Sequence, residues 1–389
     1  MNDKEWKTYK FPDFVLINPT ISLKGDGDFS FIEMKDLSEG KRFVEPSAER
    51  KVTGGARFQE DDTLFARISP CLENGKIGQA KKLKNGVGFG STEFLVFRDK
   101  LNISNKDYVY YLACWQEVRK FAEQNMIGTS GRQRVNKEAF ENLELLLPPL
   151  ETQTKIASIL SSLDEKIELN RQTNQTLEAI AQTLFKEMCL PKSEELPEGW
   201  RVGKLGEVCD VNKNSLNKKN DFLAWIDYIE ISEVSKGVVN NVTRYDLGEE
   251  PSRAKRKLKN GDVVLSTVRP DRGSYFLAIN PSKTDIVSTG FAVFSATLVP
   301  YSFLYLFLTE ENIIKYYGHI ANGGAYPAIN PNVIMDIELI IPKDDVLEQF
   351  HNTVEPLLLK YHLNNKQTQT LISIRDSLLP KLMKGEIGV

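Results

Sequence analysis

The chain has 389 residues, of which 41% are hydrophobic and 26% charged; this composition excludes wholesale disorder and allows two or three folded domains. Fifty Lys and Arg against 53 Asp and Glu leave a net charge of −3, so only local charge could indicate a polyanionic partner. Short apolar runs, a first decapeptide without an apolar signal region and scattered Cys and His residues predict a reduced cytoplasmic protein with no membrane span and no metal site.

Near the N-terminus, Asp13, Glu33 and Lys35 have a spacing similar to that of nucleases. Two carboxylates and a lysine so arranged can hold Mg²⁺ and orient water for phosphodiester cleavage. However, Glu33 follows the apolar alternation of Phe29 and Phe31, which is typical of a plain strand. A Mg²⁺-dependent nuclease therefore stays an alternative.

Other catalytic motifs are missing from the sequence. It has no glycine-rich nucleotide loop, no HExxH zinc motif and no GxSxG nucleophile motif. The segment Asn330-Pro331-Asn332 begins like an amino-methyltransferase motif but lacks the second proline and the aromatic residue that a flipped base needs. We expect no catalytic residues and no cofactor bound by this chain.

The first 150 residues predict a mixed α+β domain. Residues Phe94–Phe97 alternate as a strand and Tyr108–Gln124 form a helix. A glycine-bearing loop, Gly128–Arg134, follows. Arginines on such a loop suit phosphate contacts and guanine recognition, and a glutamine suits adenine. The predicted DNA-binding residues of this half are Arg132, Gln133, Arg134 and Lys137.

A long helix is predicted over residues 153–188, after Pro148 and Pro149. Its apolar residues recur in alternating steps of four and three, the heptad pattern of a coiled coil, with polar residues in the middle. The seam includes Leu163, Ile167, Asn170 and Leu177.

The second half again predicts an α+β domain, with strands at Val263–Thr267 and Phe291–Phe294 and a helix at Phe303–Tyr317. Its basic residues lie at 253–259 and 269–272, and a solvated charged face is an alternative for these segments, as it is for the loop Gly128–Arg134. The loop Asn322–Pro327 keeps the glycines of Gly128–Arg134 but lacks its arginines. The predicted DNA-binding residues here are Lys255, Arg256 and Lys257, for phosphate, with Arg269, Arg272 and Tyr326.

A second heptad seam includes Leu357, Tyr361, Asn364 and Leu371. Pro356 is expected to break or kink this helix, so that its continuous part begins near Leu357. Two long helices with matching seams predict an antiparallel coiled coil, with two separate core helices as the alternative. A helix of 36 residues is roughly 54 Å long, about 16 base pairs of duplex.

The chain contains an internal repeat of about 195 residues. Leu143–Pro148 matches Ile337–Pro342, and Ser91–Phe94 matches Ser288–Phe291. Looser matches pair Asp62…Arg67 with Asp262…Arg269, and Val135-Asn136 with Ile329-Asn330. Two similar halves with different loop side chains suit the recognition of two similar ligands.

The sequence resembles the specificity subunit of type I restriction-modification systems over essentially its whole length. The resemblance is carried by Leu147-Pro-Pro-Leu-Glu-Thr-Gln153 with Leu163-Asp164 and Asn170 beyond it, by Leu196-Pro-Glu-Gly-Trp200, and by the tail Leu378–Ile387. It implies target-recognition domains at 1–150 and 193–342, a central conserved helix at 151–192 and a C-terminal conserved helix at 343–389.

The resemblance also implies a function for the chain. Each domain would read one half of a bipartite, gapped site in double-stranded DNA, while the helices set the spacing and dock two modification (methyltransferase) subunits. Those partners would methylate adenine N6 with S-adenosylmethionine, and restriction (translocase and endonuclease) subunits would use ATP and Mg²⁺. A duplicated coiled-coil scaffold that binds proteins remains the main alternative.

Overall fold

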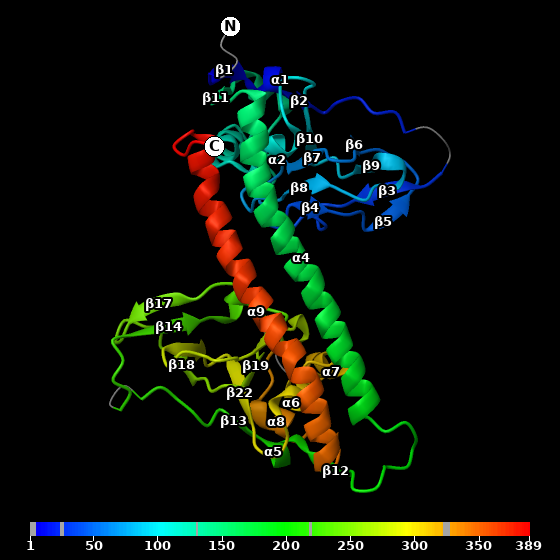
Figure 1. The fold of residues 1–389 in the computed structure, drawn as a ribbon, viewed down its shortest axis with the longest axis vertical. Coiled ribbons are helices and arrows are strands. Elements are labelled where there is room, and N and C mark those ends of the chain that lie inside the picture. The colour runs from blue at the N-terminus through cyan, green and yellow to red at the C-terminus, as the bar shows by residue number, and fades with distance from the viewer. Residues whose placement is uncertain (1–4, 24–26, 130, 218–219, 322–326) are drawn as a thin grey trace. The chain divides into compact units, whose positions relative to one another are not determined.

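The computed structural model describes residues 5–23, 27–129, 131–217, 220–321 and 327–389. Contacts between Cα atoms divide the chain into two compact units, residues 1–169 with 370–389 and residues 170–369. Figure 1 shows the chain coloured from its N-terminus to its C-terminus. Each unit combines one globular half with parts of two long helices, α4 (Leu150–Cys189) and α9 (Asp344–Met383). Within the described ranges, no helix is long and apolar enough to span a membrane.

Unit 1 contains two main sheets and a separate strand pair. The sheet orders are β2-β10-β7-β8-β4, β5-β3-β9-β6 and β1-β11. The strands are β1 (Lys7–Lys10), β2 (Val15–Ile17), β3 (Phe29–Ile32), β4 (Phe43–Val44), β5 (Ala48–Arg50), β6 (Ala56–Gln59), β7 (Thr63–Ala66), β8 (Ile77–Ala80), β9 (Val87–Gly90), β10 (Phe94–Asp99) and β11 (Glu144–Leu147). Strand β7 is buried on both faces, and its aromatic Phe65 packs on Phe97 of β10.

The helices of unit 1 are α1 (Phe11–Phe14), α2 (Lys106–Cys114) and α3 (Gln116–Gln124), with 3-10 turns η1 (Lys84–Gly86) and η2 (Lys137–Asn142). Against the five-stranded sheet, α2 packs on β7, β8 and β10, and α1 packs on β2. The single helix predicted over Tyr108–Gln124 is wrong, because the buried Trp115 has an extended backbone (φ −63°, ψ 133°) and separates α2 from α3. The side chain of Asn105 caps the start of α2 by accepting the backbone N–H groups of Asp107 and Tyr108.

Unit 2 repeats the topology of unit 1. Its sheets have the orders β13-β22-β19-β20, β17-β14-β21-β18, β12-β23 and β15-β16. The strands are β12 (Arg201–Lys204), β13 (Cys209–Val211), β14 (Trp225–Ile229), β15 (Val234–Ser235), β16 (Val238–Val239), β17 (Thr243–Asp246), β18 (Ala254–Lys257), β19 (Val263–Ser266), β20 (Tyr275–Leu277), β21 (Asp285–Ser288), β22 (Phe291–Ala296) and β23 (Glu338–Ile341). Both units contain a parallel strand pair, β3–β9 in unit 1 and β14–β21 in unit 2, and unit 1 has a second one, β4–β8.

The helices of unit 2 are α5 (Leu205–Val208), α6 (Tyr301–Leu308), α7 (Glu311–Ile320) and α8 (Pro331–Met335), with 3-10 turns η3 (Ile231–Glu233) and η4 (Pro270–Arg272). The predicted helix Phe303–Tyr317 is also two helices. The first ends at Leu308, and Glu310 caps the second, because its carboxylate accepts the N–H groups of Asn312 (2.7 Å) and Ile313 (3.3 Å). The repeated α+β domains are therefore confirmed, while each helix predicted inside a globular half is divided by a capping or extended residue.

Helices α4 and α9 pack as an antiparallel coiled coil within each unit. In unit 2, Asn174 accepts a hydrogen bond from Asn364 (2.9 Å), and Asn170 donates to Thr368 (3.3 Å). From Asn170 to Asn174 along α4, the paired residues of α9 go from Thr368 back to Asn364, so the two helices run antiparallel. Of the predicted seam, Ile167, Asn170 and Asn364 are buried, and the half-buried members are Leu163, Leu177, Leu357, Tyr361 and Leu371.

The break predicted at Pro356 is absent, since α9 is helical from Asp344 to Met383. Proline removes the N–H that would bond to the carbonyl of Asn352. Both residues are exposed, so water can solvate that carbonyl, while Val354 and Leu358 on the other face are buried. Burial of Val354 and Leu358 therefore stabilises the helical conformation on both sides of Pro356.

Candidate nucleic-acid interface

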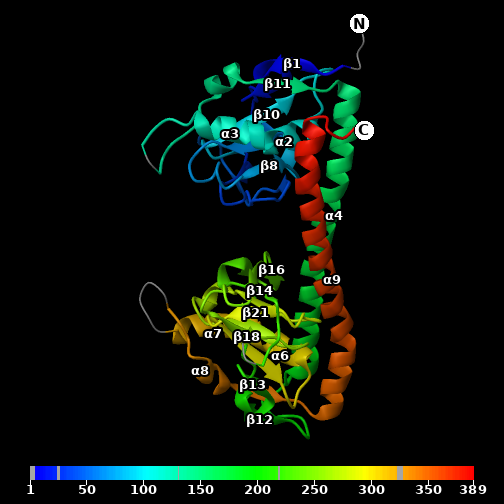
Figure 2. The same ribbon diagram turned by 90° about the vertical axis from the view of Figure 1, so that its left-hand side faces the viewer.

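The predicted reading loop of unit 1 is anchored at both ends to the chain that follows β7. The backbone N–H of Ser69 donates to the Gln133 carbonyl (3.0 Å), and that of Val135 donates to the Arg67 carbonyl (2.9 Å). Ile127 and Arg134 exchange backbone hydrogen bonds of 3.0 and 2.9 Å. Figure 2 shows the loop extending from the end of α3, on the side of unit 1 away from α4. Backbone hydrogen bonds thus fix the base of the loop.

The predicted DNA-binding side chains of this loop differ in their exposure and in their contacts with other residues. Arg132 is exposed, and no side-chain hydrogen bond is found for it within the described ranges. Lys137 is also exposed, at the start of η2, and its ammonium lies 4.0 Å from Glu138. Gln133 is half-buried. Arg134, by contrast, is held in place by a carboxylate.

That carboxylate belongs to Glu93, in the turn between β9 and β10. The Nε of Arg134 donates to both oxygens of Glu93 (2.9 Å each), and its Nη2 donates to one of them (2.8 Å). These hydrogen bonds raise the pKa of Arg134. The Nε of a second arginine, Arg67, lies 3.5 Å from the Oε2 of the same carboxylate. We call Arg67, Glu93 and Arg134 the arginine-glutamate cluster.

A groove of about 410 Å³ lies beside the arginine-glutamate cluster. Among the residues that the structure describes, the charged ones lining it are Arg57 and Arg67, so the groove suits an anionic or acceptor-rich ligand. Gly55 shapes one wall: at φ +97° its Cβ would stand 1.9 Å from the Gly90 carbonyl oxygen, so only glycine fits. The remaining lining residues are Asn18, Pro19, Thr20, Ile21, Ala56, Thr92, Phe94 and Val96.

Unit 2 has the same backbone frame at the equivalent edge. The N–H of Arg269 donates to the Pro327 carbonyl (2.8 Å), as Ser69 does to Gln133. The N–H of Ile329 donates to Thr267 (2.9 Å), as Val135 does to Arg67. Thr267, not Arg269, is therefore the counterpart of Arg67, which corrects the pairing expected from the sequence.

The side chains in this frame differ between the units. The backbone N–H of Thr267 donates to the backbone carbonyl of Gly290 (2.9 Å). The backbone N–H of Arg67 donates in the same way to the backbone carbonyl of Glu93 (3.0 Å), so Gly290 takes the place of Glu93. Ala328 forms an isolated antiparallel β-bridge with Val268, as Arg134 does with Ile68. The arginine-glutamate cluster of unit 1 is thus replaced by Thr267, Gly290 and Ala328 in unit 2.

The structure brings some predicted basic residues of unit 2 to this edge. Arg269, in a left-handed conformation (φ +46°), caps η4, which ends at the exposed Arg272. Tyr326 lies outside the described residues. Three others lie on β18: Lys255 is exposed, Arg256 is half-buried, and Lys257 forms an ion pair with Asp221.

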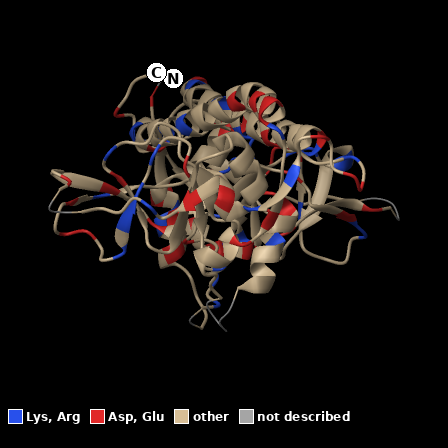
Figure 3. Ribbon diagram, turned by 90° about the horizontal axis from the view of Figure 1, so that it is seen from below, with Lys and Arg blue, Asp and Glu red and all other residues tan. Residues whose placement is uncertain are grey.

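Charge of both signs is interspersed in the protein, as Figure 3 shows. The Glu33 carboxylate lies between Lys35 (2.9 Å) and Arg50 (2.7 Å). The hydrogen bond from Lys35 lowers the pKa of Glu33. Across the described ranges, no three His, Cys, Asp or Glu side chains gather in a way that could hold a metal ion. The nuclease alternative thus finds no support, because cations rather than further carboxylates surround Glu33.

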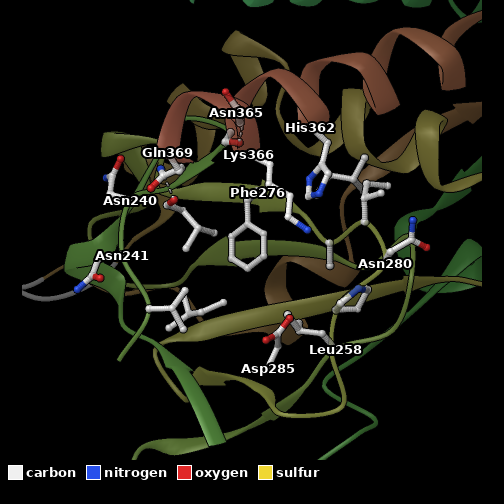
Figure 4. A pocket seen from close by; sticks show the side chains of 18 residues that line it. Asn240, Asn241, Leu258, Phe276, Asn280, Asp285, His362, Asn365, Lys366 and Gln369 are labelled. Carbon is white, nitrogen blue, oxygen red and sulfur yellow. Dashed lines mark hydrogen bonds between the residues drawn. The ribbon is translucent and has the colours of Figure 1, made fainter. Parts of the chain in front are cut away.

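Another cavity, of about 400 Å³, lies in unit 2 between α9 and the strands β16 and β20. Figure 4 shows the ring of Phe276 facing it, with Lys366 on one side and Asp285 on the other. Burial raises the pKa of Asp285, and Lys366 opposes that rise. None of the predicted DNA-binding residues that the structure describes lines this cavity.

Sequence reasoning missed Arg67 and Glu93. A signal was present, because the repeat aligns Ser91-Thr-Glu-Phe94 with Ser288-Thr-Gly-Phe291 and so sets Glu93 against Gly290. A charged residue therefore replaces glycine in an otherwise matching turn. Only the structure shows that Arg67 and Arg134 lie at that turn.

Comparisons with known proteins agree with this duplicated architecture. The family model of the type I restriction modification DNA specificity domain matches residues 3–179 and 197–371. The chain is 26% identical to the MjaIX specificity subunit of Methanocaldococcus jannaschii, over 99% of this chain and 94% of that protein. It is 25% identical to the HindI specificity subunit of Haemophilus influenzae, over 98% of this chain and all of that protein.

The fold also matches a solved structure. The S subunit of a type I restriction-modification system from M. genitalium superposes with a TM-score of 0.56, at 16% identity, over 98% of this chain and 97% of that one. The family model covers both repeats, including the loop edges and the first parts of both long helices. The chain therefore belongs to the type I restriction modification DNA specificity family.

Proposed function

We propose that this chain recognises a bipartite, gapped site in double-stranded DNA, each repeated unit reading one half-site. One observation carries the proposal: the two units share a backbone frame at their loop edges but differ in its side chains. A shared frame suits two stretches of the same polymer, and different side chains suit different base sequences. As a specificity subunit the chain recognises DNA and is not the catalytic subunit.

The partners of this recognition are two modification subunits, which methylate adenine N6 in the bound site, and restriction subunits, which translocate and cleave DNA. S-adenosylmethionine, ATP and Mg²⁺ belong to those partners, and the complex acts in the cytoplasm. Exposed apolar side chains on the long helices support protein docking. In unit 2, Ile180 of α4 is 44% exposed and Leu363 of α9 is 57% exposed. A soluble surface helix normally keeps such positions polar.

The test is methylome sequencing of cells that express this chain, a modification subunit shown to assemble with it, or both. A gapped N6-methyladenine motif should appear only when both are present. If the assembled pair produces no new motif, the chain acts as a protein-binding scaffold instead.

Salt dependence of DNA binding provides an independent measurement on the purified complex. A protein that neutralises several phosphates loses affinity steeply as salt rises, because bound counterions are released. We expect that loss for both cognate and random duplexes, with cognate DNA bound more tightly throughout. Equal affinity for the two duplexes would contradict sequence recognition.

A further inference from the structure

The arginine-glutamate cluster is present at only one of the two equivalent edges. In unit 1, Glu93 holds Arg134 through three hydrogen bonds and lies 3.5 Å from the Nε of Arg67. In unit 2 the same frame carries Thr267, Gly290 and Ala328. The cluster is therefore not needed to build the fold of a unit, since unit 2 builds the same frame without it.

The difference between the units indicates which part of DNA the cluster contacts. The phosphodiester backbone is chemically the same in both half-sites, so side chains that bind phosphate are expected at both edges. Only the base sequence differs from one half-site to the other. A charged cluster confined to one edge thus points to base recognition.

The geometry of Arg67 suits this role. Its Nε is buried without a hydrogen-bond partner in the described ranges and forms only the 3.5 Å ion pair with Glu93. Within the described ranges no hydrogen bond is found for its two terminal nitrogens, and the residue lines the groove of unit 1. Arg67 also follows β7 directly, so a buried strand fixes its backbone. A guanidinium oriented from one side keeps donors on the other side for a ligand.

Arg134 is oriented by the same carboxylate. Its Nε and Nη2 donate to Glu93 and its Nη1 donates to the Arg132 carbonyl (2.9 Å), which fixes the guanidinium plane. Base recognition requires such a fixed plane, because the two acceptors on the major-groove edge of guanine, O6 and N7, match a planar pair of donors. A phosphate contact has no such requirement.

We propose that Arg67 and Arg134 recognise guanine in the half-site read by unit 1, and that Glu93 is the positioning residue for both. The carboxylate also offsets one of the two positive charges, which lets two guanidinium groups lie together at the edge of the groove. This inference rests on the proposed DNA-recognition function.

The test compares three conservative variants in the complex with modification subunits: Glu93→Gln, Arg67→Lys and Arg134→Lys. Glu93→Gln keeps the shape of the side chain but removes its charge and one acceptor. The two lysine variants keep the positive charge but lose the planar donor pair. Glu33→Gln and Arg50→Lys serve as matched controls, because they alter an exposed arginine-glutamate pair elsewhere in unit 1.

The measurement is the base preference at every position of both half-sites, from methylome sequencing and from competition binding to single-base variants of the site. We expect each test variant to lose roughly 5- to 150-fold of its preference for guanine at one or two positions of the first half-site. The second half-site, the spacer and the control variants should keep the wild-type preference.

Three results would overturn the proposal. The first is an unchanged first half-site in the Arg67→Lys and Glu93→Gln variants. The second is a uniform loss of affinity for all sequences with a shallower salt dependence, which marks a phosphate contact. The third is a change in the second half-site. Failure of the proposed function is distinguishable, because the wild-type complex would then produce no gapped motif at all.

Discussion

Asp62 and Asp262 occupy equivalent places before β7 and β19 but have different neighbours. Each accepts the backbone N–H three residues before it, from Gln59 or Lys259 (2.7 Å each). Burial raises the pKa of both. Arg98 binds Asp62 through two hydrogen bonds of 2.7 Å, whereas Asp262 accepts a hydrogen bond from the hydroxyl of Ser295 (2.6 Å). One carboxylate is thus paired with a cation and the other with a neutral group.

The same substitution should therefore have different effects on the free energy of unfolding at these two sites. Asp62→Asn leaves the largely buried Arg98 without its counter-charge and should lower the free energy of unfolding by roughly 3 kcal/mol. Asp262→Asn keeps an oxygen that can accept the backbone N–H of Lys259, and its amide can still form a hydrogen bond with the hydroxyl of Ser295. It should leave the free energy of unfolding unchanged or slightly higher at neutral pH, because no charge remains buried.

The pH dependence provides a second readout. Because the folded-state pKa of Asp262 is raised above its unfolded value, this carboxyl contributes stability that is lost as pH rises from the unfolded to the folded pKa. Asp262→Asn should remove that contribution. Calorimetric unfolding of both variants and the wild type across this pH range measures both effects, and equal destabilisation by the two substitutions would contradict the assignment.

At the scale of elements, a buried ion pair connects α4 with α9 inside unit 1. Arg375 donates to Asp164 (2.7 Å), and Tyr111 of α2 donates to the other oxygen of that carboxylate (2.7 Å). Arg42 extends the network, because it donates to Ser161 of α4 (2.6 Å) and to Tyr111 (3.2 Å). The network therefore joins the globular part of unit 1 to both helices and specifies their register.

Asp164→Asn should lower the free energy of unfolding by about 3–5 kcal/mol, since it leaves Arg375 buried without its main counter-charge. The double variant Asp164→Leu with Arg375→Leu should recover most of this loss, because two packed leucines need no charge compensation. Denaturant unfolding of single and double variants measures the coupling. The exposed neighbour Glu165→Gln is the control and should have little effect. If the loss of unfolding free energy in the double variant equalled the sum of the losses in the two single variants, Asp164 and Arg375 would not be energetically coupled, which would contradict the assignment.

At the scale of the whole molecule, two continuous helices connect the two recognition units. The heptad seam allows insertions of seven residues without loss of side-chain register. The pairing of Asn170 with Thr368 shows where matched insertions belong, between Leu169 and Asn170 and between Thr368 and Gln369. The helices thus offer a direct way to test whether they set the spacing between half-sites.

One heptad inserted at both points adds about 10.5 Å of helix, and the spacer of the methylated site should lengthen by about three base pairs. Both half-site sequences should stay the same, because the loop edges are untouched. Methylome sequencing gives spacer and half-sites together. Insertion of four residues at both points, which disrupts the seam, is the control and should abolish the motif. An altered half-site with an unchanged spacer would refute the role of the helices in spacing.

The sequence by itself determined the repeat, the α+β halves and the two long helices with their polar mid-seam. These features depend on periodicity and on matches at a constant offset, which are local or linear properties of the chain. The family followed from motifs at the starts and ends of the helices. The break expected at Pro356 was wrong, because burial of Val354 and Leu358 outweighs a local preference.

Only the tertiary structure decided which side chains share an edge. Arg67, Glu93 and Arg134 are separated by 26 and 41 residues along the chain and meet because β7, the β9–β10 turn and the anchored loop converge. In the same way, it revealed that Thr267 rather than Arg269 matches Arg67, since backbone hydrogen bonds and not residue identity define equivalence. Long-range contacts of this kind depend on how strands pair, which the pattern of a single strand does not specify.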